Sequence, residues 1–121
     1  GAISYEGGVA LVKVGSTLFA AGGKGLQRYD VSKVSKPTKQ GELINIEVVG
    51  GINRAVALAA SESGSYLYVA GASGLIVFNI EDPKKDGLLP LSGKIDTGVL
   101  RWNGGVALLV VGSVLYVSGR K

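Results

Sequence analysis

One short sequence pattern occurs three times in this chain, and it constrains the fold more than any other feature. The copies occupy residues 15–22, 64–71 and 112–119, and each runs from Gly-Ser through apolar and aromatic residues to a closing glycine. Their starting points are almost evenly spaced along the chain. A near-constant period of this size is typical of a repeat protein, in which each period forms one supersecondary unit.

Two further apolar segments accompany the repeated pattern. One precedes it, at residues 8–14, 55–60 and 105–111, and one follows it, at residues 25–31 and 74–80. The two copies of the following segment match in order: glycine, leucine, an aromatic residue, aspartate or asparagine, and a β-branched residue. The connections between segments are short and rich in glycine, so we expect antiparallel strands joined by hairpins.

The first and last strands of each unit have different patterns. The runs that precede the repeated pattern are apolar on both faces, which predicts strands buried on both sides at a crowded centre. A fourth strand is expected at residues 42–48, where apolar and polar residues alternate, and roughly at residues 93–100 in the second unit. The polar segments before these strands, including residues 32–40, contain Pro37 and Pro83, which mark loops or edges.

Each period therefore predicts four antiparallel strands, of which the first is buried and the fourth is amphipathic. Four-stranded units of this length stacked around an axis are the blades of a β-propeller. We expect an all-β fold, a propeller segment of about two and a half blades. The expected units are the tail of a preceding outer strand at residues 1–7, a first blade at 8–50, a second at 51–104, and two strands of a third at 105–121.

Two and a half blades cannot close a ring, because propellers contain about 4 to 8 blades. The sides of the terminal blades would leave apolar area exposed, which implies a partner in a soluble protein. We expect a homo-oligomer that completes a propeller ring, other protein subunits, or the remaining part of a longer propeller. Since the chain begins at Gly1 and contains no methionine, we also expect a processed product, an expression form or a fragment.

The amino-acid composition excludes several kinds of catalytic and metal-binding site. The chain has no histidine and no cysteine, which excludes histidine-based triads, histidine or cysteine metal sites and disulfides. The longest apolar run, residues 106–111, is far shorter than the roughly 20 residues that cross a bilayer. A net charge of +4 with interspersed acidic residues indicates solubility rather than nucleic-acid binding. We expect no enzyme activity, cofactor or metal.

Three local patterns have a weak likeness to catalytic or phosphate-binding motifs. A phosphate loop needs a glycine five residues before its Gly-Lys pair and a Ser or Thr after the lysine, and the segment around Lys24 has neither. This segment is also expected in a hairpin and not at the start of a helix. Residues 92–95 fail for similar reasons. The adjacent carboxylates Glu81 and Asp82 would point to opposite sides of an extended segment, so we interpret them as part of a solvated turn.

The chain resembles the LVIVD-type β-propeller repeat family. The resemblance is carried by residues 75–79 (Leu-Ile-Val-Phe-Asn) and, in a more divergent copy, by residues 26–30, followed by polar endings. It implies a propeller fold and membership among surface and assembly proteins, hence a cell-surface or extracellular location, and it implies no shared catalytic residues. WD-type propellers are a poorer match, since the chain has no Trp-Asp pair and no histidine.

The candidate binding residues lie in loops. In a propeller, the loops from strand two to three and from strand four to the next blade emerge on the same face, and loops with aromatic and arginine residues are typical binding sites. The loops expected on this face contain Tyr5, Lys24, Asn53, Arg54, Ser73, Arg101, Trp102, Asn103 and Arg120. The opposite face would carry Lys33, Lys36, Lys39, Lys84 and Lys85.

Two functions remain open at this point. The first is a non-catalytic scaffold or protein-interaction module, a subunit of a larger assembly. The second is a ligand-binding or carbohydrate-binding (lectin-like) propeller that uses the loops around Trp102. A structural alternative for the aromatic residues is that Trp102 and Tyr5, which occupy equivalent positions, pack between blades.

Overall fold

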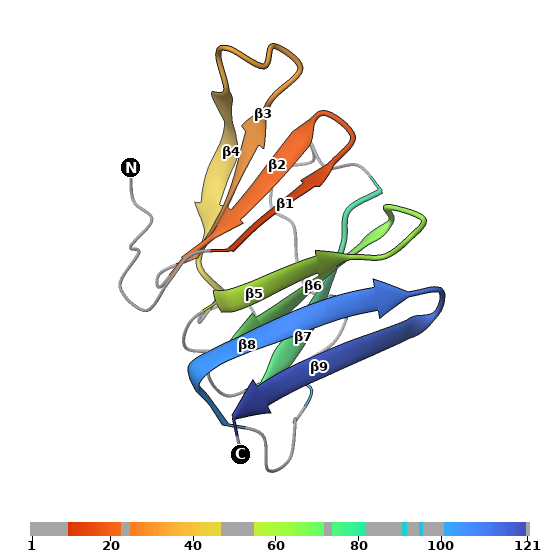
Figure 1. Ribbon diagram of the computed structural model, residues 1–121. Coiled ribbons are helices and arrows are strands. Elements are labelled where there is room, and N and C mark those ends of the chain that lie inside the picture. Colours follow the sequence, from red (N-terminus) through yellow and green to blue (C-terminus); the bar gives the residue numbers. More distant parts are fainter. Residues whose placement is uncertain are drawn as a thin grey trace.

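The protein is all-β, and its strands form separate antiparallel sheets (Figure 1). The computed structural model describes residues 10–22, 25–46, 55–71, 74–81, 91, 95 and 101–120, with only the backbone at 55, 56, 101–106, 119 and 120. The nine strands of this part form sheets of four, three and two strands. This arrangement confirms the expected fold class, a set of propeller-like blades that do not close into a ring.

The first sheet is a complete four-stranded blade. Its strands are adjacent in chain order: β1 (Ala10–Val14), β2 (Thr17–Ala21), β3 (Leu26–Asp30) and β4 (Thr38–Ile44). The pairing of β4 differs from the sequence-based expectation, because Asp30 pairs with Thr38 directly after Pro37. The polar residues 38–40 therefore belong to the strand and not to the loop, and the predicted strand start at residue 42 is wrong.

The second and third sheets repeat this meander with fewer described strands. The second contains β5 (Ala55–Ala60), β6 (Tyr66–Gly71) and β7 (Leu75–Asn79), and the third contains β8 (Arg101–Val111) and β9 (Val114–Arg120). Ile95 forms an antiparallel bridge with Leu75, with backbone hydrogen bonds of 3.1 and 2.8 Å. A residue of the predicted outer segment 93–100 thus lies beside β7.

The glycine that opens each repeated pattern has a conformational role. Gly15, Gly64 and Gly112 occupy equivalent turns between the first and second strands, with φ angles of 59°, 76° and 58°. A side chain at such a φ crowds the following carbonyl oxygen, so glycine is strongly favoured there. The repeat in the sequence therefore reflects a repeated left-handed turn as well as repeated apolar strands.

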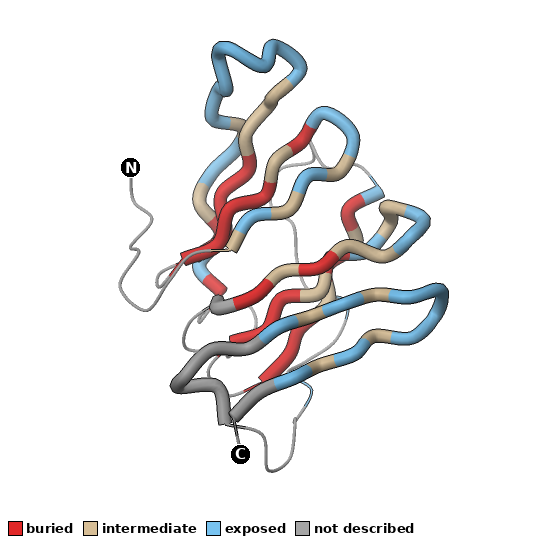
Figure 2. Tube along the Cα trace, in the orientation of Figure 1, coloured by how far each residue is buried: buried red, intermediate tan, exposed pale blue. Residues whose placement is uncertain are grey.

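The sheets stack face to face, and apolar side chains fill the space between them. We call the side of a sheet that faces the next sheet in chain order its forward face, and the opposite side its backward face. Buried residues of the first sheet's forward face, including Phe19 and Leu26, form one cluster with Leu67 and Phe78 on the backward face of the second. Figure 2 shows these facing segments as buried and the outer hairpin β8–β9 as largely exposed.

A second, smaller cluster joins the second and third sheets. Buried Ala57, Ala70 and Leu75 on the forward face of β5–β7 contact Leu108 and, on β9, Leu115 and Val117. Both clusters therefore follow the same rule, in which a forward face packs against the backward face of the following sheet.

The first strands of the three sheets are not equally buried, contrary to the expectation from their composition. β5 lies between β1 and β8, and its Ala57 and Ala59 are buried. In β1 and in residues 107–111 of β8 the side chains alternate between half-buried and exposed, and Leu11 and Leu109 are 61% and 62% exposed. The prediction of two-sided burial is wrong for β1 and β8, because burial on both faces requires a neighbouring sheet on each side.

Candidate interaction surface

The forward face of β8–β9 is apolar and faces no other described part of the chain. Its residues are set by the strand register, because antiparallel partners project to the same side of a sheet. Leu109 pairs with Tyr116, and Val111 pairs with Val114. The described side chains of this face are those of Ala107, Leu109, Val111, Val114, Tyr116 and Ser118.

All six side chains of this face are exposed. Leu109 is 62%, Tyr116 57%, Val111 54% and Val114 49% exposed. None of the six is charged, and their only polar side-chain groups are the hydroxyls of Tyr116 and Ser118. These six side chains can pack against another apolar surface.

The repeat shows what this face corresponds to in the other sheets. Phe19, Tyr68 and Tyr116 occupy the same position of the repeated pattern, each on the forward face of its sheet. Phe19 is fully buried in the cluster that joins the first and second sheets, and Tyr68 is partly buried beside the cluster that joins the second and third. Tyr116 is the equivalent side chain without a following sheet in the described structure.

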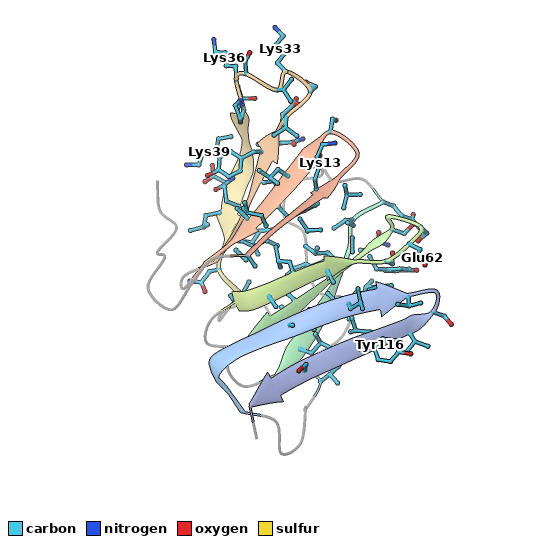
Figure 3. The ribbon with its side chains drawn as sticks, viewed as in Figure 1. Lys13, Lys33, Lys36, Lys39, Glu62 and Tyr116 are labelled. Atoms are coloured by element: carbon cyan, nitrogen blue, oxygen red, sulfur yellow. The ribbon has the colours of Figure 1, made fainter. Side chains whose placement is uncertain are left out.

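The β8–β9 hairpin is fixed to the second sheet at its turn. The backbone N–H of Gly112 donates a 2.8 Å hydrogen bond to Oε1 of Glu62, which lies in the turn between β5 and β6. Figure 3 shows Glu62 beside this hairpin and Tyr116 on β9, far from Lys33 and Lys36 at the other end of the molecule. The turn contact and the apolar cluster together hold the exposed face in a defined orientation.

The loop residues that the sequence suggested as a binding site lie mostly outside the described residues. These are Tyr5, Lys24, Asn53, Arg54 and Ser73.

The remaining four candidates belong to strands and not to loops. Arg101, Trp102 and Asn103 are part of the backbone of β8, Arg120 is part of β9, and Arg101 pairs with Arg120. Their expected loop placement is wrong, because the pairing of β8 with β9 continues across a register shift between Arg101 and Val106. The structure brings Arg101 and Arg120 to paired positions of one hairpin.

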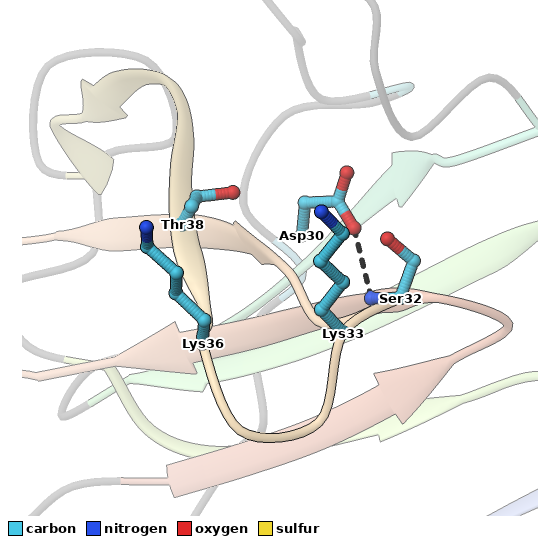
Figure 4. Close-up of a pocket in the computed structure, with 5 residues that line it drawn as sticks. All are labelled: Asp30, Ser32, Lys33, Lys36 and Thr38. Carbon is cyan, nitrogen blue, oxygen red and sulfur yellow. Dashed lines mark hydrogen bonds between the residues drawn. The ribbon is translucent and has the colours of Figure 1, made fainter.

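A polar pocket of about 240 Å³ lies at the β3–β4 connection (Figure 4). It is lined by Asp30, Ser32, Lys33, Lys36 and Thr38. The Ser32 N–H donates a 2.9 Å hydrogen bond to Asp30 Oδ1, which shapes the turn. Lys33 and Lys36 belong to the lysine-bearing face predicted from the sequence, whereas Lys84 and Lys85 lie outside the described residues. The mixture of charges gives this pocket no single ligand preference.

Sequence reasoning anticipated apolar area on a terminal blade but did not identify the residues of the β8–β9 face. The available signal was the third copy of the pattern itself. Its alternate residues, Val114 and Tyr116, are as apolar as those of the buried copies, although no matching third-strand segment follows them in the printed sequence.

Comparisons with known proteins give no family assignment. No protein-family model matches this sequence, and no curated protein matches it. The resemblance to the LVIVD-type repeat therefore stays a prediction. Among the described residues, no helix is long and apolar enough to cross a membrane, and no three acidic, histidine or cysteine residues gather as a metal-binding group.

Proposed function

We propose that this chain is a non-catalytic scaffold of the β-propeller type that acts by binding other proteins through the outer faces of its sheets. The observation that supports this function is the forward face of β8–β9, where four large apolar side chains are about half exposed or more. Contiguous exposed apolar patches are typical of protein interaction sites. The non-catalytic part of the proposal rests on the sequence, which has no histidine or cysteine.

The proposed partners are sheets of the same kind. Both internal interfaces pair a forward face with a backward face, and the β8–β9 face has the residues of a forward face. A second copy that completes a ring, another subunit, or further blades of a longer protein could each supply the covering sheet.

Sedimentation velocity over a wide concentration range tests this function. We expect wild-type protein to form a discrete larger species as concentration rises, by mass action. Leu109→Lys places a charge on the apolar face and is expected to shift the equilibrium toward the monomer. Val34→Lys is the matched control, because Val34 is 90% exposed in the β3–β4 loop, away from either sheet face. A wild-type chain that stays monomeric at every concentration, without any binding partner, contradicts the proposal.

The carbohydrate-binding alternative stays a prediction from the sequence. It depends on Trp102, whose backbone lies in β8. A glycan array probed with wild type and Trp102→Ala separates the two functions: glycan binding that is lost in the variant supports a lectin, and no binding by either protein removes that function.

A further inference from the structure

Two faces of the stacked sheets are left without a neighbouring sheet in the described structure, and they lie at opposite ends of the stack. One is the forward face of β8–β9. The other is the backward face of β1–β4, where Leu11 is exposed, Leu18 and Tyr29 are half-buried, and Ala20 and Gln27 are buried. One is a forward face and the other a backward face, and each interface inside the chain also joins a forward face to a backward face.

Resting on the proposed function, we propose that a second copy of this chain docks head to tail, with the forward face of β8–β9 against the backward face of β1–β4. Two such junctions related by a two-fold axis close the assembly. A closed pair of chains covers the exposed apolar residues of both faces and leaves no free face from which a filament could grow.

The internal interfaces define how the two faces fit. Phe19 on the forward face of the first sheet and Leu67 on the backward face of the second belong to one buried cluster. Leu18 and Leu67 occupy the same position of the repeated pattern, one residue before the forward-facing aromatic. Tyr116 of one copy is therefore expected to pack against Leu18 of the second copy, beside Leu11.

The exposure of the first strands supports the same junction. Leu11 on β1 and Leu109 on β8 are exposed to nearly equal degrees, 61% and 62%. Their equivalents on the middle strand β5 are covered: Leu58, equivalent to Leu11, packs against the first core cluster, and Ala59, equivalent to Leu109, is buried. Head-to-tail docking gives β1 and β8 the two-sided environment that β5 already has.

The turn of the first sheet has room for the end of β8 from a second copy. Inside the chain, the end of β1 contacts the turn of the second sheet, where Val14 Cγ1 lies 3.3 Å from the position of a Cβ at Gly64. Val111 and Gly15 are the corresponding residues of the proposed junction. Val111 is 54% exposed, and the space beside the α-carbon of Gly15 is open, with no atom within 4 Å of an added Cβ.

Charge distinguishes this pairing from two others. The backward face of the first sheet carries Lys13 and Lys39, so two backward faces would bring lysines together. Two forward faces could meet without repulsion, but they would leave Leu11 exposed. In the head-to-tail junction the lysines lie at the margins, Lys13 next to the turn and Lys39 on the edge strand β4, where their stems can pack and their ammonium groups reach water.

Site-directed cross-linking tests the geometry, because the chain has no native cysteine. The full chain is prepared as Leu11→Cys and as Leu109→Cys, and each variant is oxidised alone and as an equal mixture. Val34→Cys, at a position 90% exposed and away from both faces, measures disulfides formed by random collision. Far-UV circular dichroism confirms that each variant folds, and sedimentation gives its assembly state before oxidation.

The head-to-tail pair predicts that the mixture forms a Leu11→Cys/Leu109→Cys disulfide dimer about tenfold or more above the Val34→Cys background, since cross-linking within a complex has a high effective concentration. Each variant alone should stay at the background. Self-cross-linking of Leu109→Cys alone shows two forward faces in contact and overturns this proposal, while the scaffold function survives. Background cross-linking with an associated wild type overturns the proposed junction alone. Background cross-linking with a monomeric wild type that binds no partner overturns both.

Discussion

Replacement of Phe78 by alanine tests the packing between the first two sheets. Phe78 is fully buried on the backward face of β5–β7, in the cluster that also contains Phe19 and Ile44. Truncating a buried phenylalanine loses its transfer free energy and leaves a cavity, at a cost of about 3–5 kcal/mol. Since domains of this size are stable by about 5–15 kcal/mol, Phe78→Ala is expected to remove about a fifth or more of the free energy of unfolding.

Urea denaturation followed by far-UV circular dichroism measures this loss. The matched control is Tyr116→Ala, an aromatic truncation on the exposed forward face of β9. In dilute protein this control is expected to change the free energy of unfolding by less than about 0.5 kcal/mol. A loss below about 1 kcal/mol for Phe78→Ala, or equal losses for the two variants, would refute the stacking of the sheets.

Three further substitutions test local features of the first sheet, each by the same denaturation assay. Gly25→Ala is expected to cost about 3 kcal/mol, because a Cβ there collides with the carbonyl oxygen of Ile44. Gly15→Ala, which has open space but a φ of 59°, should cost only about 1 kcal/mol, and the reverse order would contradict this account. Gln27→Leu should cost about 1–3 kcal/mol although it adds apolar character, because the buried Nε2 donates to the carbonyl oxygens of Arg28 and Gly41 at 3.1 and 3.2 Å. A neutral or stabilised Gln27→Leu variant, with Lys39→Leu as the exposed control, would show that these hydrogen bonds contribute nothing net.

The repeat in the sequence predicted the order and pairing of most strands. The glycine-bounded pattern fixes β2, β6 and β9, and the short turns place their neighbours beside them. Burial was harder to predict, because it depends on which sheet lies next to which. The runs around Leu11, Leu58 and Leu108 have similar composition, and in the described part of the chain only the middle run has a sheet on both sides.

The polar residues of the first sheet were also outside the reach of pattern reasoning. Gln27 and Arg28 occupy the positions of Ile76 and Val77, yet both side chains are 1% exposed. A polar residue in an alternating pattern is normally placed toward water. Here the amide of Gln27 is buried because backbone carbonyls of β3 and of β4 accept its hydrogen bonds. Such tertiary partners cannot be read from the strand pattern alone.

The sequence indicated an apolar area on a terminal blade but not the residues of the β8–β9 face. The count of repeated segments indicated an uncovered terminal blade, which the exposed face of β8–β9 agrees with. The named candidates came instead from an assumed loop geometry. Arg101 and Trp102 show why this failed, because the β8–β9 ladder extends further than the apolar run that the sequence displays.

The central claim is that the forward face of β8–β9 is covered by another sheet when the chain assembles. Hydrogen–deuterium exchange of the full chain, measured at low and at high protein concentration, tests it most directly. We predict that amides of β8 and β9 gain protection as concentration rises, while amides of β6, which is paired on both sides in the middle sheet, do not change. Equal exchange of β8 and β9 at all concentrations, in the full chain without any other partner, would contradict the claim.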